Sequence, residues 1–100
     1  MARYKLIALS NAKDGREAEF NDWYDKIHLP DMLKIPGVMS GERFVNAFPA
    51  AHKFVAVFDI ETESLEAMGA EINARAASGE MVVSDALDTD SVLMNFCAPY

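Results

Sequence analysis

The sequence is most decisive at residues 53–60, KFVAVFDI, where Phe54 to Phe58 form an unbroken apolar run. Successive side chains of a β-strand point to opposite faces of the sheet, so a strand with one solvated face alternates apolar and polar residues. In this run both faces are apolar, and residues 92–96, VLMNF, show much the same pattern. These strands predict a sheet that is covered on both of its faces.

Turn formers and changes of apolar period divide the rest of the chain. Phe20, Trp23, Tyr24 and Ile27 follow the i, i+3, i+4, i+7 spacing of an amphipathic helix. Pro30 predicts the end of this helix, because its ring disfavours helical geometry at the preceding residue and removes a backbone donor. The expected elements are strands at 3–10, 38–48, 53–60 and 91–98, a helix from Arg16, a helical turn at 31–34, a second helix at 64–77, turns at 11–15 and 49–52, and a short helix or turn at 80–87.

The order strand-helix-strand-strand-helix-strand is that of the ferredoxin-like βαββαβ unit. It predicts one α+β domain over residues 1–100, with both helices on one face of a four-stranded antiparallel sheet. A second copy of the same sheet is the simplest cover for the other face. We therefore expect a homodimer in which two sheets pack as a dimeric α+β barrel.

Composition narrows the classes of partner. The chain has 100 residues, 51% of them apolar, and a formal net charge of −7 at pH 7, with a basic residue only at Arg75 in the last forty. Nucleic acids and anionic membranes need clusters of Lys and Arg, so neither is an expected partner. Cys97 is the only cysteine, and no apolar run is long enough for a signal peptide core or a membrane span. The expected location is the cytoplasm.

Most of the candidate functional residues lie in one motif, residues 19–38, EFNDWYDKIHLPDMLKIPGV. It joins an aromatic helix face to a histidine and two prolines. Together with residues 41–44, GERF, and 87–90, LDTD, it resembles the EthD-like family of the dimeric α/β-barrel superfamily. That superfamily includes polyketide cyclases, lactone isomerases, cofactor-free monooxygenases and haem-degrading enzymes, so the resemblance indicates a fold more than an activity. It also implies that the histidine of the motif lines a cavity.

His28 and Tyr24 are the candidate catalytic residues. An imidazole titrates near neutral pH and suits a general acid or base, while Tyr24, one helical turn earlier, suits a hydroxyl donor to substrate. Asp25 or Asp31 would serve as an orienting carboxylate. The alternative is a histidine at a helix C-terminus that hydrogen-bonds a terminal carbonyl group.

Trp23, Arg43 and Asn95 are the candidate substrate-binding residues. Most of the aromatic side chains are expected in the core, with Trp23 a weaker candidate for a ligand contact. Arg43 would clamp a carboxylate or else form a structural ion pair with an acid such as Asp59. Asn95 is expected as a buried amide that points into the pocket or across the dimer.

Two residues are kept as further candidates because a histidine and a cysteine take part in the lactone isomerases of the superfamily. His52 is otherwise an exposed loop histidine, and Cys97 a buried strand thiol. Neither the two histidines, 24 residues apart, nor any Cys pair makes a metal site. No cofactor is expected, although haem on His28 stays open through the resemblance.

Three functions remain. The first is a cofactor-independent enzyme that acts on an aromatic or polyketide-like carbonyl compound, with His28 abstracting a proton for isomerisation, cyclisation or dehydration. The second is a cofactor-free monooxygenase. The third is a dimeric binding or accessory protein for a small hydrophobic or aromatic ligand in a catabolic pathway.

Overall fold

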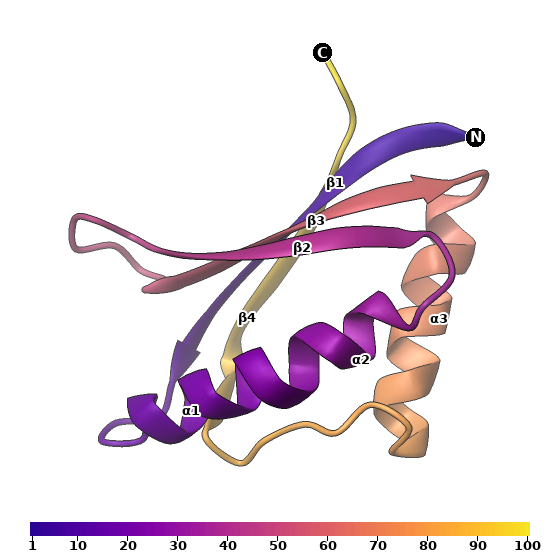
Figure 1. Ribbon diagram of the computed structural model, residues 1–100. Coiled ribbons are helices and arrows are strands. Elements are labelled where there is room, and N and C mark those ends of the chain that lie inside the picture. Colours follow the sequence, from indigo (N-terminus) through magenta and orange to yellow (C-terminus); the bar gives the residue numbers. More distant parts are fainter.

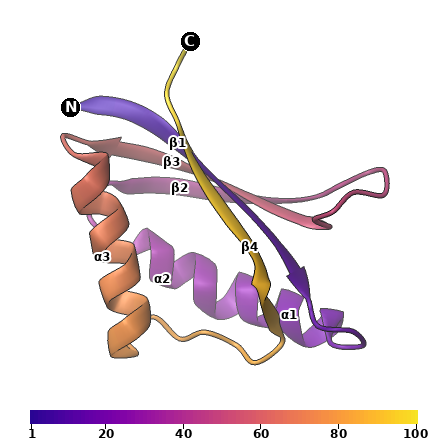
Figure 2. The same cartoon turned by 180° about the vertical axis from the view of Figure 1, so that it is seen from behind.

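A computed structural model describes all of residues 1–100. It has a four-stranded antiparallel sheet of order β2-β3-β1-β4, with the helices on one face (Figures 1 and 2). The predicted ferredoxin-like α+β fold is confirmed. The elements are β1 Ala2–Ala12, α1 Glu17–Trp23, a π-helical turn Tyr24–His28, α2 Leu29–Leu33, β2 Val38–Val45, β3 Phe54–Thr62, α3 Leu65–Ser78 and β4 Leu87–Cys97.

The two faces of the sheet differ. In β3 every second residue from Phe54 to Ile60 is buried against the helices, whereas Val55 and Val57 lie on the opposite face. Residues paired across neighbouring strands share a face, so the register defines this second, open face over the whole sheet. Its apolar side chains are Ile7, Leu9, Phe44, Val55, Val57 and Leu93.

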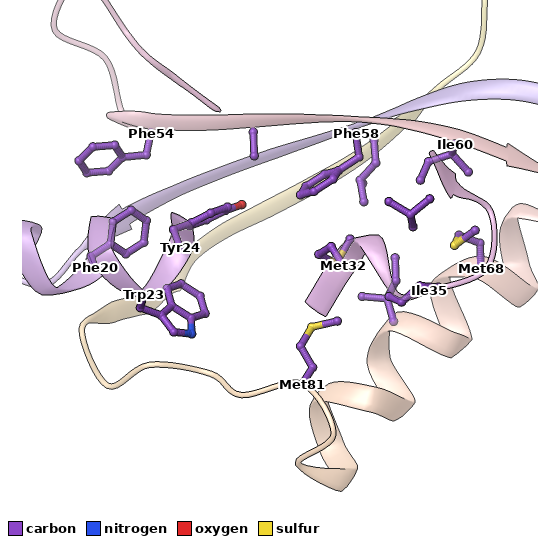
Figure 3. Packing of buried hydrophobic residues seen from close by; sticks show 14 of the residues in the cluster. Phe20, Trp23, Tyr24, Met32, Ile35, Phe54, Phe58, Ile60, Met68 and Met81 are labelled. Carbon is purple, nitrogen blue, oxygen red and sulfur yellow. The ribbon is translucent and has the colours of Figure 1, made fainter. Parts of the chain in front are cut away.

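The core lies between the helices and the sheet (Figure 3). At one end, aromatic rings from the first helix meet β3, with the Phe20 and Phe54 centroids 4.9 Å apart. At the other end, aliphatic and methionine side chains from α2, α3 and the following segment fill the space. The buried residues there include Met32, Ile35, Ile60, Met68, Ile72 and Met81.

The first helix does not end at Pro30. It continues from α1 through the π-helical turn into α2, and the Leu29 N–H donates to the carbonyl group of Tyr24, five residues back. A π turn holds one more residue than an α turn, and this wider turn accommodates a proline that lacks a donor and would crowd a regular helix. The predicted stop is therefore wrong, and the helix runs on to Leu33.

The predicted limits of β1 and β4 are also corrected. Asn11 and Ala12, expected in a turn, pair with Asp88 and Leu87 beyond a register shift after Leu9. Each strand therefore extends because the other supplies hydrogen-bonding partners. Residues 80–86, expected as a short helix or turn, form an irregular segment between α3 and β4.

Helix α3 begins and ends at residues that favour helix ends. The hydroxyl of Ser64 accepts a hydrogen bond from the Ala67 N–H at the start of α3, and Gly79 with φ 83° follows its end. These are the expected N-cap and C-cap residues. None of the helices combines the length and the hydropathy that crossing a membrane requires.

Candidate functional site

The π-helical turn assembles an aromatic and imidazole cluster. Because this turn spans five residues, it places Trp23 beside His28, with the rings stacked at a centroid distance of 4.8 Å and an interplanar angle of 25°. The Tyr24 ring meets the same imidazole edge-on at 4.7 Å and 82°. The predicted proximity of Tyr24 and His28 is therefore found, with Trp23 as an additional wall.

His28 is held as a neutral base. Its ring is half-buried, and its Nδ1 atom is fully buried with no hydrogen-bond partner. Burial lowers the pKa of His28 from 6.5 to about 4, the Asp31 carboxylate opposes this shift, and the Arg43 guanidinium adds to it. An unpaired buried N–H is rarer than an unpaired acceptor, so we assign the lone pair to Nδ1 and the proton to Nε2.

The two expected partners of His28 are absent. Asp25 binds Arg43 and Asp31 accepts from the Val82 N–H, so neither carboxylate hydrogen-bonds the imidazole. The alternative of a helix-terminal histidine bonded to a carbonyl group is wrong as well, because the helix continues beyond His28. Contact with two aromatic rings orients the imidazole instead.

Tyr24 is a buried phenol that stays protonated. Burial raises its pKa from 10.0 to about 12, although the Arg43 guanidinium acts in the opposite direction. Figure 3 shows the hydroxyl group pointing into the layer between the helix and the sheet. The guanidinium carbon of Arg43 lies 4.4 Å from the centroid of the ring, in a cation–π contact. Tyr24 can therefore donate a hydrogen bond inside an apolar layer.

Arg43 is held in place by the first helix. Its Nη1 donates to Asp25 Oδ1 at 2.9 Å and its Nη2 to Asn21 Oδ1 at 2.7 Å. The expected structural ion pair is therefore found, but with Asp25 and not with Asp59, because the register puts Arg43 on the helix face of the sheet and Asp59 on the open face, where it binds Lys5. With these bonds Arg43 supports Tyr24 and is not a free clamp for a carboxylate.

Trp23 and Asp31 join the helix to the irregular segment. The indole Nε1–H of Trp23 donates to the Val82 carbonyl oxygen at 2.9 Å, and Asp31 Oδ2 accepts from the Val82 N–H at 3.2 Å. Lys34 Nζ lies 3.7 Å from the other oxygen of Asp31. One residue of the segment is thus held by two side chains that flank His28 in the helix.

Three candidates lie outside this cluster. Asn95 and Cys97 pair with Ile7 and Lys5, so both belong to the open face, and both are exposed in the single chain. Neither side chain is buried within one chain, and Asn95 lies on the face where the sequence predicts the second copy to pack. His52 is half-buried instead of exposed, and its Nε2 lies 2.8 Å from the Ser91 carbonyl oxygen, in a structural contact of the β2–β3 loop.

A pocket also lies on the open side of the sheet. This pocket of about 500 Å³ is lined by ten residues, among them Lys5, Met39, Asp59, Cys97 and Pro99. A second, shallow hollow lies beside α3 at Pro36 and Met68. Neither is lined by His28 or Tyr24, and Nδ1 of His28 is buried from solvent.

The sequence did not single out Asn21 or Val82. Asn21 precedes Asp25 by one helical turn, and this spacing was a signal that both could hold the same arginine. Val82 acts through its main chain, which leaves no trace in the side-chain pattern. Its role depends on how residues 79–86 cross the helix.

No protein-family model matches the chain, and no curated protein matches it by sequence. Solved structures do match its fold. A protein described as a "putative monooxygenase" from Shewanella loihica PV-4 aligns with a TM-score of 0.67 and 19% identity over 99% of this chain and 95% of its own. At3g17210 from Arabidopsis thaliana aligns with a TM-score of 0.66 and 23% identity, over 97% and 95% of the two chains.

A third structure bears on the resemblance in the sequence. An ethyl tert-butyl ether D (EthD) family protein from Bacillus halodurans C-125 aligns with a TM-score of 0.63 and 17% identity, over 98% of this chain and 99% of its own. At these identities the likeness is one of fold. The chain therefore has the ferredoxin-like fold of an EthD family protein, as its helix motif predicts.

Proposed function

We propose that the chain is a small cofactor-independent enzyme in which His28 abstracts a proton from an aromatic or polyketide-like carbonyl compound. The observation that carries this proposal is the buried, unpaired Nδ1 of a neutral imidazole directly beside a protonated phenol. A base and a hydrogen-bond donor in one apolar layer are the two groups that enolisation needs.

The proposed step is a proton transfer. The acidic C–H bond next to the carbonyl group breaks, Nδ1 of His28 takes the proton, and the electron pair moves to the carbonyl oxygen. Tyr24 donates a hydrogen bond to the enolate oxygen. A low pKa disfavours the imidazolium in the empty site, but the enolate arises together with it and supplies the missing counter-charge.

The products depend on where the enolate reacts. Return of the proton to another carbon gives isomerisation, attack on a second carbonyl group gives cyclisation, and loss of hydroxide gives dehydration. The walls favour a flat apolar substrate, because the rings of Trp23 and Tyr24 lie against the imidazole and the nearby cation, Arg43, is already paired.

A second candidate is a cofactor-free monooxygenase, which the printed description of the Shewanella structure favours. The same two residues would act on a phenol. His28 would remove the phenolic proton, and the resulting anion would itself transfer electrons to molecular oxygen. This reaction consumes oxygen, whereas the first one does not.

We further propose that the active form is a homodimer joined through the open faces of two sheets. No helix lies over the six apolar side chains of that face, and Phe44 and Leu93 are 50% and 46% exposed. An apolar face of this kind is typical of an obligate interface.

The experiment follows deuterium exchange into 2-tetralone, an aromatic ketone with acidic α-protons, in D₂O, with an oxygen electrode in parallel. We expect exchange without oxygen uptake, and a loss of roughly 10²-fold in His28→Gln. Tyr24→Phe should keep the fold and lose rate, while His52→Gln serves as the matched histidine control. Binding of the ketone with no exchange above the buffer rate would instead indicate a binding protein, and oxygen uptake with a phenolic substrate a monooxygenase.

A further inference from the structure

Residues 79–86 cross the first helix on the side away from β2 and β3 (Figures 1 and 3). The segment is fixed at both ends, where Met81 and Ala86 are 3% and 0% exposed and the Ala86 carbonyl group accepts from the Lys13 N–H at 2.8 Å. Between these ends, Val82 and Val83 expose about half of their side chains. The middle of the segment is therefore held by few apolar contacts.

Val82 provides the hydrogen bonds that tie residues 82–84 to the helix. Its carbonyl oxygen accepts from Trp23 Nε1 and its N–H donates to Asp31 Oδ2, so both main-chain groups of one residue are bound by helix side chains. Trp23 is also the residue that stacks on His28. The two bonds form a clip, which we define as the Trp23–Val82–Asp31 contact.

A base whose acceptor atom is buried needs an opening. Nδ1 of His28 is buried, and neither of the two hollows is lined by this residue. The sheet side of the cluster is core, with Phe20 and Phe58 among the largest fully buried side chains. Residues 82–84, in the middle of the segment, are tied to the helix only by the two bonds of Val82 and expose their valine side chains, so they are the part of the enclosure that moves at least cost.

We propose that Trp23 and Asp31 are positioning residues that hold residues 82–84 as a lid over His28, and that release of the clip at Val82 admits the substrate. This inference rests on the proposed function for its purpose, because a lid matters only if His28 meets a ligand. Asp31 acts through Val82, while Trp23 acts both through Val82 and as a wall against the His28 ring, and neither takes part in the proton transfer. The lid also excludes water while the proton is transferred.

The test removes one hydrogen bond of the clip and follows the other bond by NMR hydrogen exchange, without substrate. Trp23→Phe removes the donor to the Val82 carbonyl group but leaves the Val82 N–H bonded to Asp31. If the two bonds act as one clip, exchange of the Val82 N–H should nevertheless rise about tenfold, as expected for losing one hydrogen bond from the closed state. Conversely, Asp31→Ala should raise exchange of the Trp23 indole N–H by a similar factor.

Conservative and internal controls separate a lid from a general loss of stability. Asp31→Asn keeps an acceptor for Val82 and should restore indole exchange close to that of the unmodified chain. Amides of the central strands β1 and β3 should not change in any variant. In Trp23→Phe, which alters no charge, the pKa of His28 should rise from about 4 towards 6.5 as water reaches the ring.

The lid is overturned if Trp23→Phe leaves Val82 exchange unchanged, or if Val82 and the central strands accelerate equally. The unmodified chain gives an independent check, since Val82 must exchange faster than the central strands. If the Val82 N–H of the unmodified chain exchanges only through global unfolding, this result alone overturns the lid. None of these readouts needs turnover, so a confirmed clip in a chain that exchanges no ketone protons would refute the proposed function alone.

Discussion

At the scale of single residues, the environment of His28 decides its protonation state. Burial of the ring outweighs the attraction of Asp31, so the imidazole is neutral and Nδ1 keeps a free lone pair. The pKa of Tyr24, in the same apolar layer, is raised, so the phenol keeps its proton. The same desolvation thus prepares one residue to accept a proton and the other to donate a hydrogen bond.

This protonation state predicts how stability depends on pH. His28 titrates near 6.5 in the unfolded chain and at about 4 in the folded one, so between these values the unfolded chain binds more protons. The free energy of unfolding should therefore fall as the pH is lowered from about 6.5 to about 4, by roughly 3 kcal/mol at most. Urea unfolding at several pH values should show this slope, and His28→Gln should lack it. An equal slope in both proteins would contradict the buried neutral ring.

At the scale of elements, the π-helical turn is what builds the site. In a regular helix the neighbours of His28 are Tyr24 and Asp25, and the sequence spacing predicts these contacts. The wider turn replaces Asp25 by Trp23, and Asp25 turns to Arg43. Proline position alone did not reveal this, because a proline favours a helix end and a π turn through the same missing donor.

The sequence predicted the order and type of all four strands and both main helices, because these depend on local apolar period and turn residues. It did not predict the ends of β1 and β4, because each depends on pairing with the other. The sequence also could not predict which face of the sheet carries Asn95, since a run that is apolar on both faces does not indicate which face meets the helices. The helix motif located His28 and Tyr24, but Val82 contributes only its main chain.

Gly37, which leads from the first helix into β2, gives a prediction at this scale. It has φ 98°, and an added Cβ would lie 2.7 Å from Met68 Cε and 2.8 Å from the Glu61 carbonyl oxygen. Gly37→Ala should lower the free energy of unfolding by about 2–3 kcal/mol. Gly15, with φ 75° and nothing within 4 Å, is the matched control, and Gly15→Ala should cost only ~1 kcal/mol. Equal losses in urea unfolding would contradict the close packing at Gly37.

At the scale of the whole molecule, the uneven distribution of burial is the main feature. One face of the sheet carries a closed core, while the other exposes apolar side chains and, apart from them, holds a pocket of about 500 Å³. The acidic excess lies in the last forty residues, and the first sixty, which carry the His28 cluster, have eight acidic and eight basic residues. The net charge therefore favours solubility more than it describes a substrate.

The open face predicts self-association. Val57 lies near its centre, between Ile7 and Glu42 in the register of the sheet. Val57→Lys should convert a dimer into a monomer in sedimentation at micromolar concentration, because burying a charged ammonium group among apolar side chains is costly. Val83→Lys, on the far side of the helices, is the matched substitution and should remain dimeric. A folded monomer in the unmodified chain would contradict the proposed interface.

The most direct test of His28 as a neutral base is the pH dependence of kcat/KM for α-proton exchange. If Nδ1 of the buried imidazole accepts the proton, the rate should stay constant between about pH 6 and 8 and fall only as the pH approaches about 4, where the ring becomes protonated. His28→Gln should lose both the α-proton exchange activity and the dependence on an ionisation near pH 4. A rate that falls below pH 6.5, or a full rate in His28→Gln, would contradict the account.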